Sequence, residues 1–296
     1  MSGKYQIVEV NPKWMVWPEE MGSKRKFWYQ PIEDPGSRWL FKYPQEGAGQ
    51  HWAEKIAAEV ASVLQVHHAT VELATYKGAY GSVAQSFATQ GRSLHHGNQL
   101  LEVALHDYDG TMTYNQSHHT LINIFKTLEK IFLLPTKRQE VKLQLASYMV
   151  LDALIGNVDR HHENWGILSW SDEDQWSCEL SPSFDHASSL GRELLDERRD
   201  KYLEEDRVKN YSGRGRGAIY WSNHDRNGPS PVELVRRGTD SFPDIFGPAL
   251  KDLNLLHEQG FSEIVNRIPE SWMSSSARQF AIALMCYNHR QLQELV

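Results

Sequence analysis

The segment from Leu151 to Leu190 constrains the fold of this chain more than any other. It begins as the end of an apolar helical pattern, QEVKLQLASYMVLDALI (139–155), and the pattern stops at Gly156. Glycine is the residue best suited to the left-handed backbone that commonly ends a helix. The loop that follows Gly156 is therefore expected to start from a fixed support.

Polar side chains follow this helix at a characteristic spacing. Asp159 lies in the loop, and Asn164 comes five positions later. Two short strand-like segments around an acidic turn then occupy 165–180, and Asp185 follows them. A hairpin between Asn164 and Asp185 would bring both side chains back to one end of a small sheet. The order loop, hairpin and carboxylate is thus predicted to gather three oxygen-bearing side chains.

Phosphoryl transfer in kinases uses these parts at about this separation. A carboxylate lies near the accepting hydroxyl, and an Asn and a second Asp hold Mg²⁺ against the phosphates of ATP. We therefore assign Asp159 as the base and Asn164 and Asp185 as metal ligands. The Asp-x4-Asn spacing alone is weak support, because Asp and Asn are frequent in ordinary loops. The succession of helix end, loop, hairpin and second carboxylate carries the assignment.

Two stretches carry a family resemblance. LIGNVDRHHENWGIL and SPSFDHASSLG closely resemble the catalytic and metal-binding motifs of the HipA-like serine/threonine kinases. More distantly, they are similar to loops of secretory-pathway kinases and type II phosphatidylinositol 4-kinases. The resemblance extends over roughly residues 20–190. It implies a two-lobed α+β protein-kinase-like fold, with a sheet-rich N-terminal lobe (1–90), a larger helical lobe (91–296), and ATP and Mg²⁺ bound between them.

A lysine in a strand-like run precedes an amphipathic helix. Lys42 lies in WLFKY (39–43), and the helix is expected over 51–64. A strand lysine paired with a helix glutamate positions the nucleotide phosphates in kinases, so Lys42 is the predicted nucleotide-binding lysine. The resemblance of WAEKIAAEVA favours Glu54 as its partner. On a helical wheel, however, Glu54 lies opposite the apolar stripe and Glu59 flanks it, so Glu59 stays as the alternative.

A polar turn and a hinge complete the predicted nucleotide site. Gly22 and Ser23 open the stretch GSKRK, which ends at Lys26. Such turns wrap phosphates with backbone N–H groups and a cation, although a bare Gly-Ser-Lys is more often a hairpin turn. The family has a Gly-Ser/Ala-x-x-Lys loop here that can carry an autophosphorylated serine, which makes Ser23 the candidate. The resemblance also places the hinge that meets the adenine near Phe87.

The rest of the chain reads mainly as helices. We expect one helix over 120–134, ended by Pro135, and another over 137–155. The charge-dense stretch 192–209 reads as a solvated helix held by i,i+4 pairs. Residues 211–217 read as a flexible basic loop, with substrate access or a plain linker as the two interpretations. The segment 231–296 reads as helices that cover the catalytic lobe.

Four His-His pairs, His67-His68, His95-His96, His118-His119 and His161-His162, raise a metal hypothesis. Neighbouring residues point in different directions on a helix or strand and chelate poorly, and no H-E-x-x-H pattern occurs. The rival enzyme class is a metal-dependent phosphohydrolase that uses His161, His162, Asp159 and Asp185. It would require a transition metal and water as acceptor.

Composition restricts the remaining function classes. The 296-residue chain has a net charge of −7 and only two cysteines. A disulfide scaffold is excluded, and broad nucleic-acid binding has no electrostatic support. No apolar run is long enough for a membrane span, and the first residues lack the apolar core of a signal peptide. We expect a cytoplasmic protein without membrane contact.

The resemblance also implies partners. HipA-like proteins associate with HipB-like DNA-binding antitoxins and belong to toxin-antitoxin systems, so a HipB-like partner and a translation component as protein substrate are expected. Only about twenty residues precede the phosphate loop here, so the chain resembles a compact member without the family's extra N-terminal subdomain. A kinase-like binding module without catalysis and a kinase with a lipid acceptor are the remaining alternatives.

Overall fold

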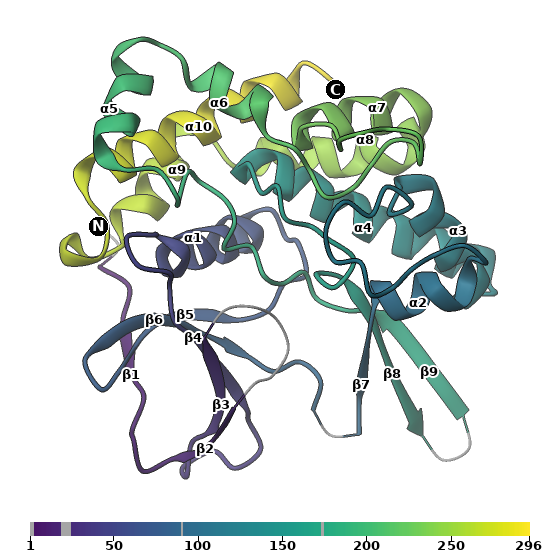
Figure 1. Ribbon diagram of the computed structural model, residues 1–296, viewed down its shortest axis with the longest axis horizontal. Coiled ribbons are helices and arrows are strands. Elements are labelled where there is room, and N and C mark those ends of the chain that lie inside the picture. The colour runs from purple at the N-terminus through teal and green to yellow at the C-terminus, as the bar shows by residue number, and fades with distance from the viewer. Residues whose placement is uncertain (1–2, 19–24, 90, 173–174) are drawn as a thin grey trace.

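A computed structural model describes residues 3–18, 25–89, 91–172 and 175–296. These residues form a sheet-rich N-terminal lobe and a larger helical lobe (Figure 1). The strands of the N-terminal sheet, in spatial order, are β1 (Ile7–Glu9), β5 (Val71–Tyr76), β6 (Ala79–Gln85), β4 (Trp39–Lys42), β3 (Lys26–Gln30) and β2 (Met15–Pro18). Neighbouring strands are antiparallel except for the β1–β5 pair, which is parallel. The predicted α+β class is confirmed.

The two faces of this sheet pack against different neighbours. Successive residues of a strand point to opposite faces, and on β5 Leu73 joins the main core whereas Ala74 joins a separate aromatic cluster. In that cluster the rings of Phe27 and Phe41 are stacked with their centroids 5.1 Å apart. Phe41 is fully buried and directly precedes Lys42. The strand that carries Lys42 is therefore anchored by this aromatic cluster on one face of the sheet.

Helix α1 (Gln50–Val63) lies between the sheet and the helical lobe (Figure 1). Ile56, Val60 and Leu64 belong to the core that also contains α4 and α9 residues. Glu54 and Lys55 are buried as well, with 1% and 3% of their surface exposed. The helical wheel assumed one buried stripe, and that assumption is wrong here because α1 is covered on nearly all sides.

The helical lobe is built around one long helix that ends at the loop with Asp159. Its elements are α2 (Gly97–Ala104), α3 (Leu121–Ile131), α4 (Pro135–Ile155), α5 (Asp196–Glu204), α6 (Val208–Arg214), α7 (Pro231–Ser241), α8 (Pro243–Lys251), α9 (Glu258–Asn266) and α10 (Ser275–Gln293), with short 3₁₀ turns at Asp252–Leu255 and Glu270–Trp272. Helix α4 packs against α7, α8 and α10, which cover it. Its C-terminal half, from Leu145 to Ile155, is almost entirely buried.

A second, three-stranded sheet lies beside the first (Figure 1). Its order is β7 (Ser93–His96), β8 (Gly166–Asp172) and β9 (Gln175–Leu180), and all pairs are antiparallel. The expected hairpin between Asn164 and Asp185 is thus confirmed. No helix among the described residues is long and apolar enough to span a bilayer.

Three expectations about the helices were wrong in detail. Helix α3 ends at Ile131, and Pro135 starts α4 instead of ending α3, because proline lacks an N–H and fits the first turn of a helix. The stretch 192–209 forms parts of two helices, broken where Asp206 takes a left-handed backbone with φ 49°. In it Arg199 is buried and bonds Asp196 and the carbonyl of Gly191, so this stretch is not simply solvated. Residues 211–214 continue α6 and are helical, not a loop.

Candidate active site

The loop with Asp159 starts from a strongly fixed point. Gly156 ends α4 with φ 67°, the left-handed conformation expected for it. The next residue, Asn157, is 2% exposed; its backbone N–H donates to the carbonyl of Asp152 and its side-chain amide to the carboxylate of Asp152, both at 2.8 Å. The first turn after the helix is therefore tied back to the helix itself.

Arg160 ties the loop to the segment that carries Asp185. Arg160 is 3% exposed, and its guanidinium donates two hydrogen bonds to Asp152, Nε to Oδ2 at 2.7 Å and one Nη to Oδ1 at 2.8 Å. The other Nη donates to the carbonyls of Asn164 at 2.8 Å and Phe184 at 3.3 Å. Burial lowers the pKa of Arg160, but the carboxylate of Asp152 outweighs this effect, and the net pKa is raised. The buried guanidinium of Arg160 thus fixes the loop with Asp159 against the segment that carries Asp185.

The roles of Arg160 and Asp152 were not predicted from the sequence. The available signal was an aspartate inside the apolar run LDALI, followed eight positions later by an arginine. A buried charge needs a partner, so such an aspartate in a core helix predicts a nearby cation.

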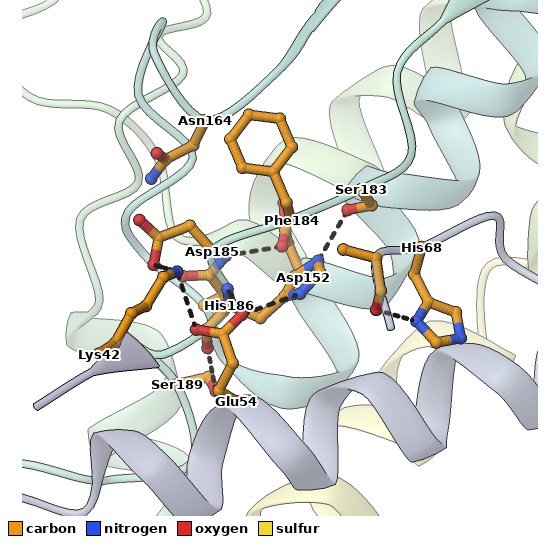
Figure 2. Close-up of polar contacts among 12 residues, drawn as sticks. Lys42, Glu54, His68, Asp152, Asn164, Ser183, Phe184, Asp185, His186 and Ser189 are labelled. Atoms are coloured by element: carbon orange, nitrogen blue, oxygen red, sulfur yellow. Dashed lines mark hydrogen bonds and ion pairs between the residues drawn. The ribbon is translucent and has the colours of Figure 1, made fainter. Parts of the chain in front are cut away.

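Asp159 and Asn164 are joined through the backbone of the loop. The side-chain amide nitrogen of Asn164 donates to the carbonyl of Asp159 at 2.7 Å, and the N–H of His161 donates to the same carbonyl at 2.8 Å. Because the amide nitrogen of Asn164 faces a carbonyl, its amide oxygen points the other way. Figure 2 shows the side chain of Asn164 near the carboxylate of Asp185, with the amide nitrogen on the side of Asp185 in this view. The carboxylate of Asp159 accepts a hydrogen bond from Ser188 at 3.1 Å.

Lys42 reaches from the N-terminal sheet to the helical lobe. Its Nζ lies 3.2 Å from Oδ1 of Asp185 and 3.7 Å from Oε2 of Glu54 (Figure 2). Burial lowers the pKa of Lys42, but the two carboxylates raise it by more, so the amine stays a cation. The alternative partner, Glu59, instead pairs with Lys55 at 2.7 Å and with Arg267 at 3.4 Å.

Glu54 also holds the segment of Asp185. Its Oε1 accepts a hydrogen bond of 2.9 Å from the backbone N–H of His186. The imidazole of His186 is fully buried against Ser183, with 2.7 Å between Nε2 and Oγ, and burial lowers its pKa well below the usual range. Asp185 takes a left-handed backbone with φ 57°, which aspartate tolerates better than most residues. One carboxylate on α1 therefore contacts both Lys42 and the segment that carries Asp185.

Two of the remaining predicted nucleotide residues, Lys26 and Phe87, lie near this group. Lys26 is opposite Lys42 in the β3–β4 register. Phe87 follows β6, and its ring centroid is 5.4 Å from that of Phe184, the residue before Asp185. Gly22 and Ser23 lie outside the described residues.

The histidines named for the rival enzyme class are not assembled with the carboxylates. Nδ1 of His162 lies 2.7 Å from the hydroxyl of Tyr108, and burial lowers the pKa of His162 to about 4. Nδ1 of His161 accepts a hydrogen bond of 3.2 Å from the N–H of Glu163. Within the described parts of the chain, no three His, Cys, Asp or Glu side chains form a group that could hold a metal ion.

The donor set fits a magnesium nucleotide better than a protein-only metal site. Mg²⁺ prefers oxygen ligands and is usually held by one or two side chains together with substrate phosphates. The amide oxygen of Asn164 and the carboxylate of Asp185 could provide two such ligands, and Lys42 places a cation 3.2 Å from that carboxylate. The site therefore has the composition expected for Mg²⁺ bound with a triphosphate.

A separate cavity of about 540 Å³ is not lined by any of the residues predicted to bind ATP or Mg²⁺, or by Asp159. It lies where α1, α5 and α10 begin, and it is lined by residues that include His51, Trp52, Leu194 and Trp272. Burial lowers the pKa of His51 to about 4, and the backbone of Trp272 offsets part of this effect.

Comparison with known proteins now places the fold and the family. The chain has a protein-kinase-like fold. A family model described as the HipA-like C-terminal domain matches residues 10–221, and the chain belongs to this family. Comparison with curated proteins gave no match.

Two solved structures illustrate the likeness. The proinflammatory kinase CtkA of Helicobacter pylori is 17% identical, with a TM-score of 0.77, and the match covers 98% of this chain and 96% of CtkA. HipA of Shewanella oneidensis MR-1, solved with HipB and operator DNA, is 14% identical with a TM-score of 0.55, and the match covers 95% of this chain and 67% of HipA. At these identities the likeness shows the fold.

Proposed function

We propose that this protein is an ATP-dependent serine/threonine protein kinase of the HipA-like type. The observation that carries the proposal is the position of Lys42, with Nζ 3.2 Å from Asp185 and 3.7 Å from Glu54. In kinases the strand lysine, the helix glutamate and the metal-binding aspartate must be in place together for transfer. Here Lys42 contacts both carboxylates.

The nucleotide is assigned to the space around Lys42, Asn164 and Asp185. Lys42 would contact the phosphates of ATP, and Asn164 and Asp185 would hold Mg²⁺, which neutralises charge on the phosphates when bound. Lys26 and the turn with Gly22 are assigned to the phosphates as well, and Phe87 to the adenine. The position of β7, which pairs with β8 and not with the N-terminal sheet, supports a lobe boundary near residue 90.

Asp159 is proposed as the base. Its carboxylate already accepts a hydroxyl hydrogen bond, and the loop around it is fixed through Asn157, Arg160 and Asn164. It would orient the acceptor hydroxyl and take its proton as the bond to phosphorus forms. Such a site acts mainly through positioning and charge.

The acceptor is proposed to be a protein hydroxyl, with a translation component as the expected substrate and Ser23 as an autophosphorylation site. The family supports these assignments. The Shewanella HipA was solved in a complex with HipB and DNA, so a HipB-like protein is the proposed partner. Co-purification with a HipB-like protein would test the partnership.

Transfer of labelled γ-phosphate from ATP with Mg²⁺ tests the proposal. The acceptors are the protein itself and the proteins of a cell lysate. We expect transfer by the wild type, loss in Asp159→Ala and in Asp185→Asn, and no loss in Asp244→Asn, which alters an exposed carboxylate on α8. Phosphate released only to water would instead support the phosphohydrolase alternative. ATP binding without any transfer would support a binding module.

A further inference from the structure

A hydroxyl of the chain itself occupies the place where Asp159 would receive its substrate. Oγ of Ser188 donates a hydrogen bond of 3.1 Å to Oδ2 of Asp159. Ser188 comes three residues after Asp185 and is half-buried. Its carbonyl accepts a hydrogen bond of 3.4 Å from the N–H of Val158, so the two loops are also joined by their backbones. A general base within hydrogen-bond reach of a hydroxyl is the geometry that proton abstraction needs.

An arginine with unused hydrogen-bonding capacity lies on the other side of this hydroxyl. One Nη of Arg192 donates to Oγ of Ser188 at 3.3 Å, and the other approaches the side chain of Gln45 at 3.5 Å. Nε of Arg192 is buried without a hydrogen-bond partner, and among the described residues no carboxylate forms an ion pair with this guanidinium. A buried donor without a partner is costly. A phosphate on Ser188 would supply acceptor oxygens for it, in the charge-assisted pairing that arginine favours.

The neighbouring serine has different surroundings. Oγ of Ser189 is 2.7 Å from the carbonyl of His186, to which it donates, and Ser189 is 1% exposed. Within the described part of the chain it forms no hydrogen bond with Asp159 or Arg192. The two adjacent serines therefore form a matched pair, with one hydroxyl at the base and one directed into the protein.

Given the proposed kinase function, on which this inference rests, we propose that Ser188 is itself an acceptor and is phosphorylated within the same molecule. The bond between the γ-phosphorus of ATP and its bridging oxygen breaks, and ADP leaves with the bond's electron pair. A bond forms between the γ-phosphorus and Oγ of Ser188. The proton of Ser188 passes to Oδ2 of Asp159. No other reactant is needed.

The modification would limit further transfer. A phosphoserine carries nearly two negative charges at neutral pH. Repulsion from Asp159 and Asp185 would turn the phosphate toward Arg192. The backbone of Arg192 is fixed, because its carbonyl accepts a hydrogen bond of 2.9 Å from the N–H of Gly49. A phosphate so placed blocks the approach of a second hydroxyl to Asp159. Transfer to other proteins should therefore slow as Ser188 becomes phosphorylated.

Mass spectrometry on the full chain tests this proposal. The protein is first dephosphorylated, then incubated with Mg²⁺ and ATP in the presence of casein, and fragmentation assigns the phosphate to Ser188 or Ser189. We expect phosphate on Ser188, at a fractional rate that does not change with protein concentration. The Ser189→Ala variant should be modified at Ser188, the Ser188→Thr variant should carry the phosphate on its introduced threonine, and Asp159→Ala should carry none at this position.

The outcomes separate the two proposals. Phosphate on casein or on other residues of the chain, with Ser188 unmodified, would overturn this inference and leave the proposed kinase in place. Modification of Ser188 that persists in Asp159→Ala, or that rises with protein concentration, would also overturn it. Absence of transfer to every acceptor would overturn the proposed function, and the inference with it.

Discussion

Glu54 accepts the backbone N–H of His186 at 2.9 Å, so a helix of the N-terminal lobe holds the segment that carries Asp185. The second oxygen of the same carboxylate lies 3.7 Å from Lys42. Movement of α1 would change both contacts together. The position of α1 is therefore coupled to the contact between Lys42 and Asp185.

Replacement of Glu54 by glutamine tests this relationship. Glu54→Gln keeps an oxygen that can accept the His186 N–H but removes the charge that attracts Lys42. Removing one partner of a buried ion pair costs about 3–5 kcal/mol when no other partner remains; because Lys42 keeps Asp185, kcat/KM for ATP should fall by roughly ten- to a hundredfold. Steady-state kinetics with Glu59→Gln as control should show little change in the control, because Glu59 pairs with Lys55 and Arg267. Equal effects of the two substitutions would contradict this account.

Arg160→Ala should destabilise the protein strongly. It would leave Asp152, which is 4% exposed, as a buried charge without its partner. Breaking a buried pair in this way costs about 3–5 kcal/mol. Urea unfolding measures the change. The exposed pair of Arg92 and Glu179, also joined at 2.8 Å, provides the comparison. Arg92→Ala should cost no more than about 1 kcal/mol, and a similar loss in both variants would show that Arg160 is not a structural anchor.

Acid should destabilise the fold through His119. Its Nδ1 lies 2.8 Å from the carbonyl of Ala218, and Nε2 accepts a hydrogen bond of 3.0 Å from the indole of Trp165. Burial lowers the pKa of His119 to about 3. Between this pKa and the unfolded value near 6.5, the unfolded chain binds more protons, so stability is fully present above about 6.5 and falls as the pH falls.

Unfolding at pH 7 and at pH 5 measures this effect. His119 should account for a loss on the order of 2 kcal/mol between the two values. In His119→Gln the loss between pH 7 and pH 5 should be smaller by that amount, whatever the variant's stability at pH 7. The exposed His224→Gln serves as control. An unchanged pH dependence in His119→Gln would show that His119 is not the responsible group.

Local patterns predicted the parts of the site that depend on short segments of sequence. The helix end at Gly156, the hairpin before Asp185 and the strand with Lys42 each follow from periodicity and turn residues. The family resemblance added the choice of Glu54. The helical wheel disfavoured Glu54 because it treats a helix as having one buried face, whereas α1 is packed between a sheet and a helical lobe.

Contacts between segments far apart in the chain could not be predicted from local sequence patterns. Ser188 contacts Asp159, and Arg192 contacts Ser188, only because the chain after Asp185 turns back toward the loop. Arg199 lies in a stretch whose charge pattern predicts a solvated helix, yet it is buried beside Trp52, with its guanidinium 5.9 Å from the ring. A charge pattern indicates which residues can be exposed to solvent, but tertiary packing determines which of them are buried.

Measurement of both ATP binding and phosphoryl transfer on one preparation of Asp159→Asn tests the central claim most directly. The substitution removes the proposed base and leaves Lys42, Asn164 and Asp185 in place. We predict that Asp159→Asn binds Mg²⁺-ATP about as tightly as the wild type and transfers phosphate roughly 10²–10⁴ times more slowly, the contribution typical of a general base. Transfer at the wild-type rate by Asp159→Asn would contradict the assignment of the base and of the site built around it.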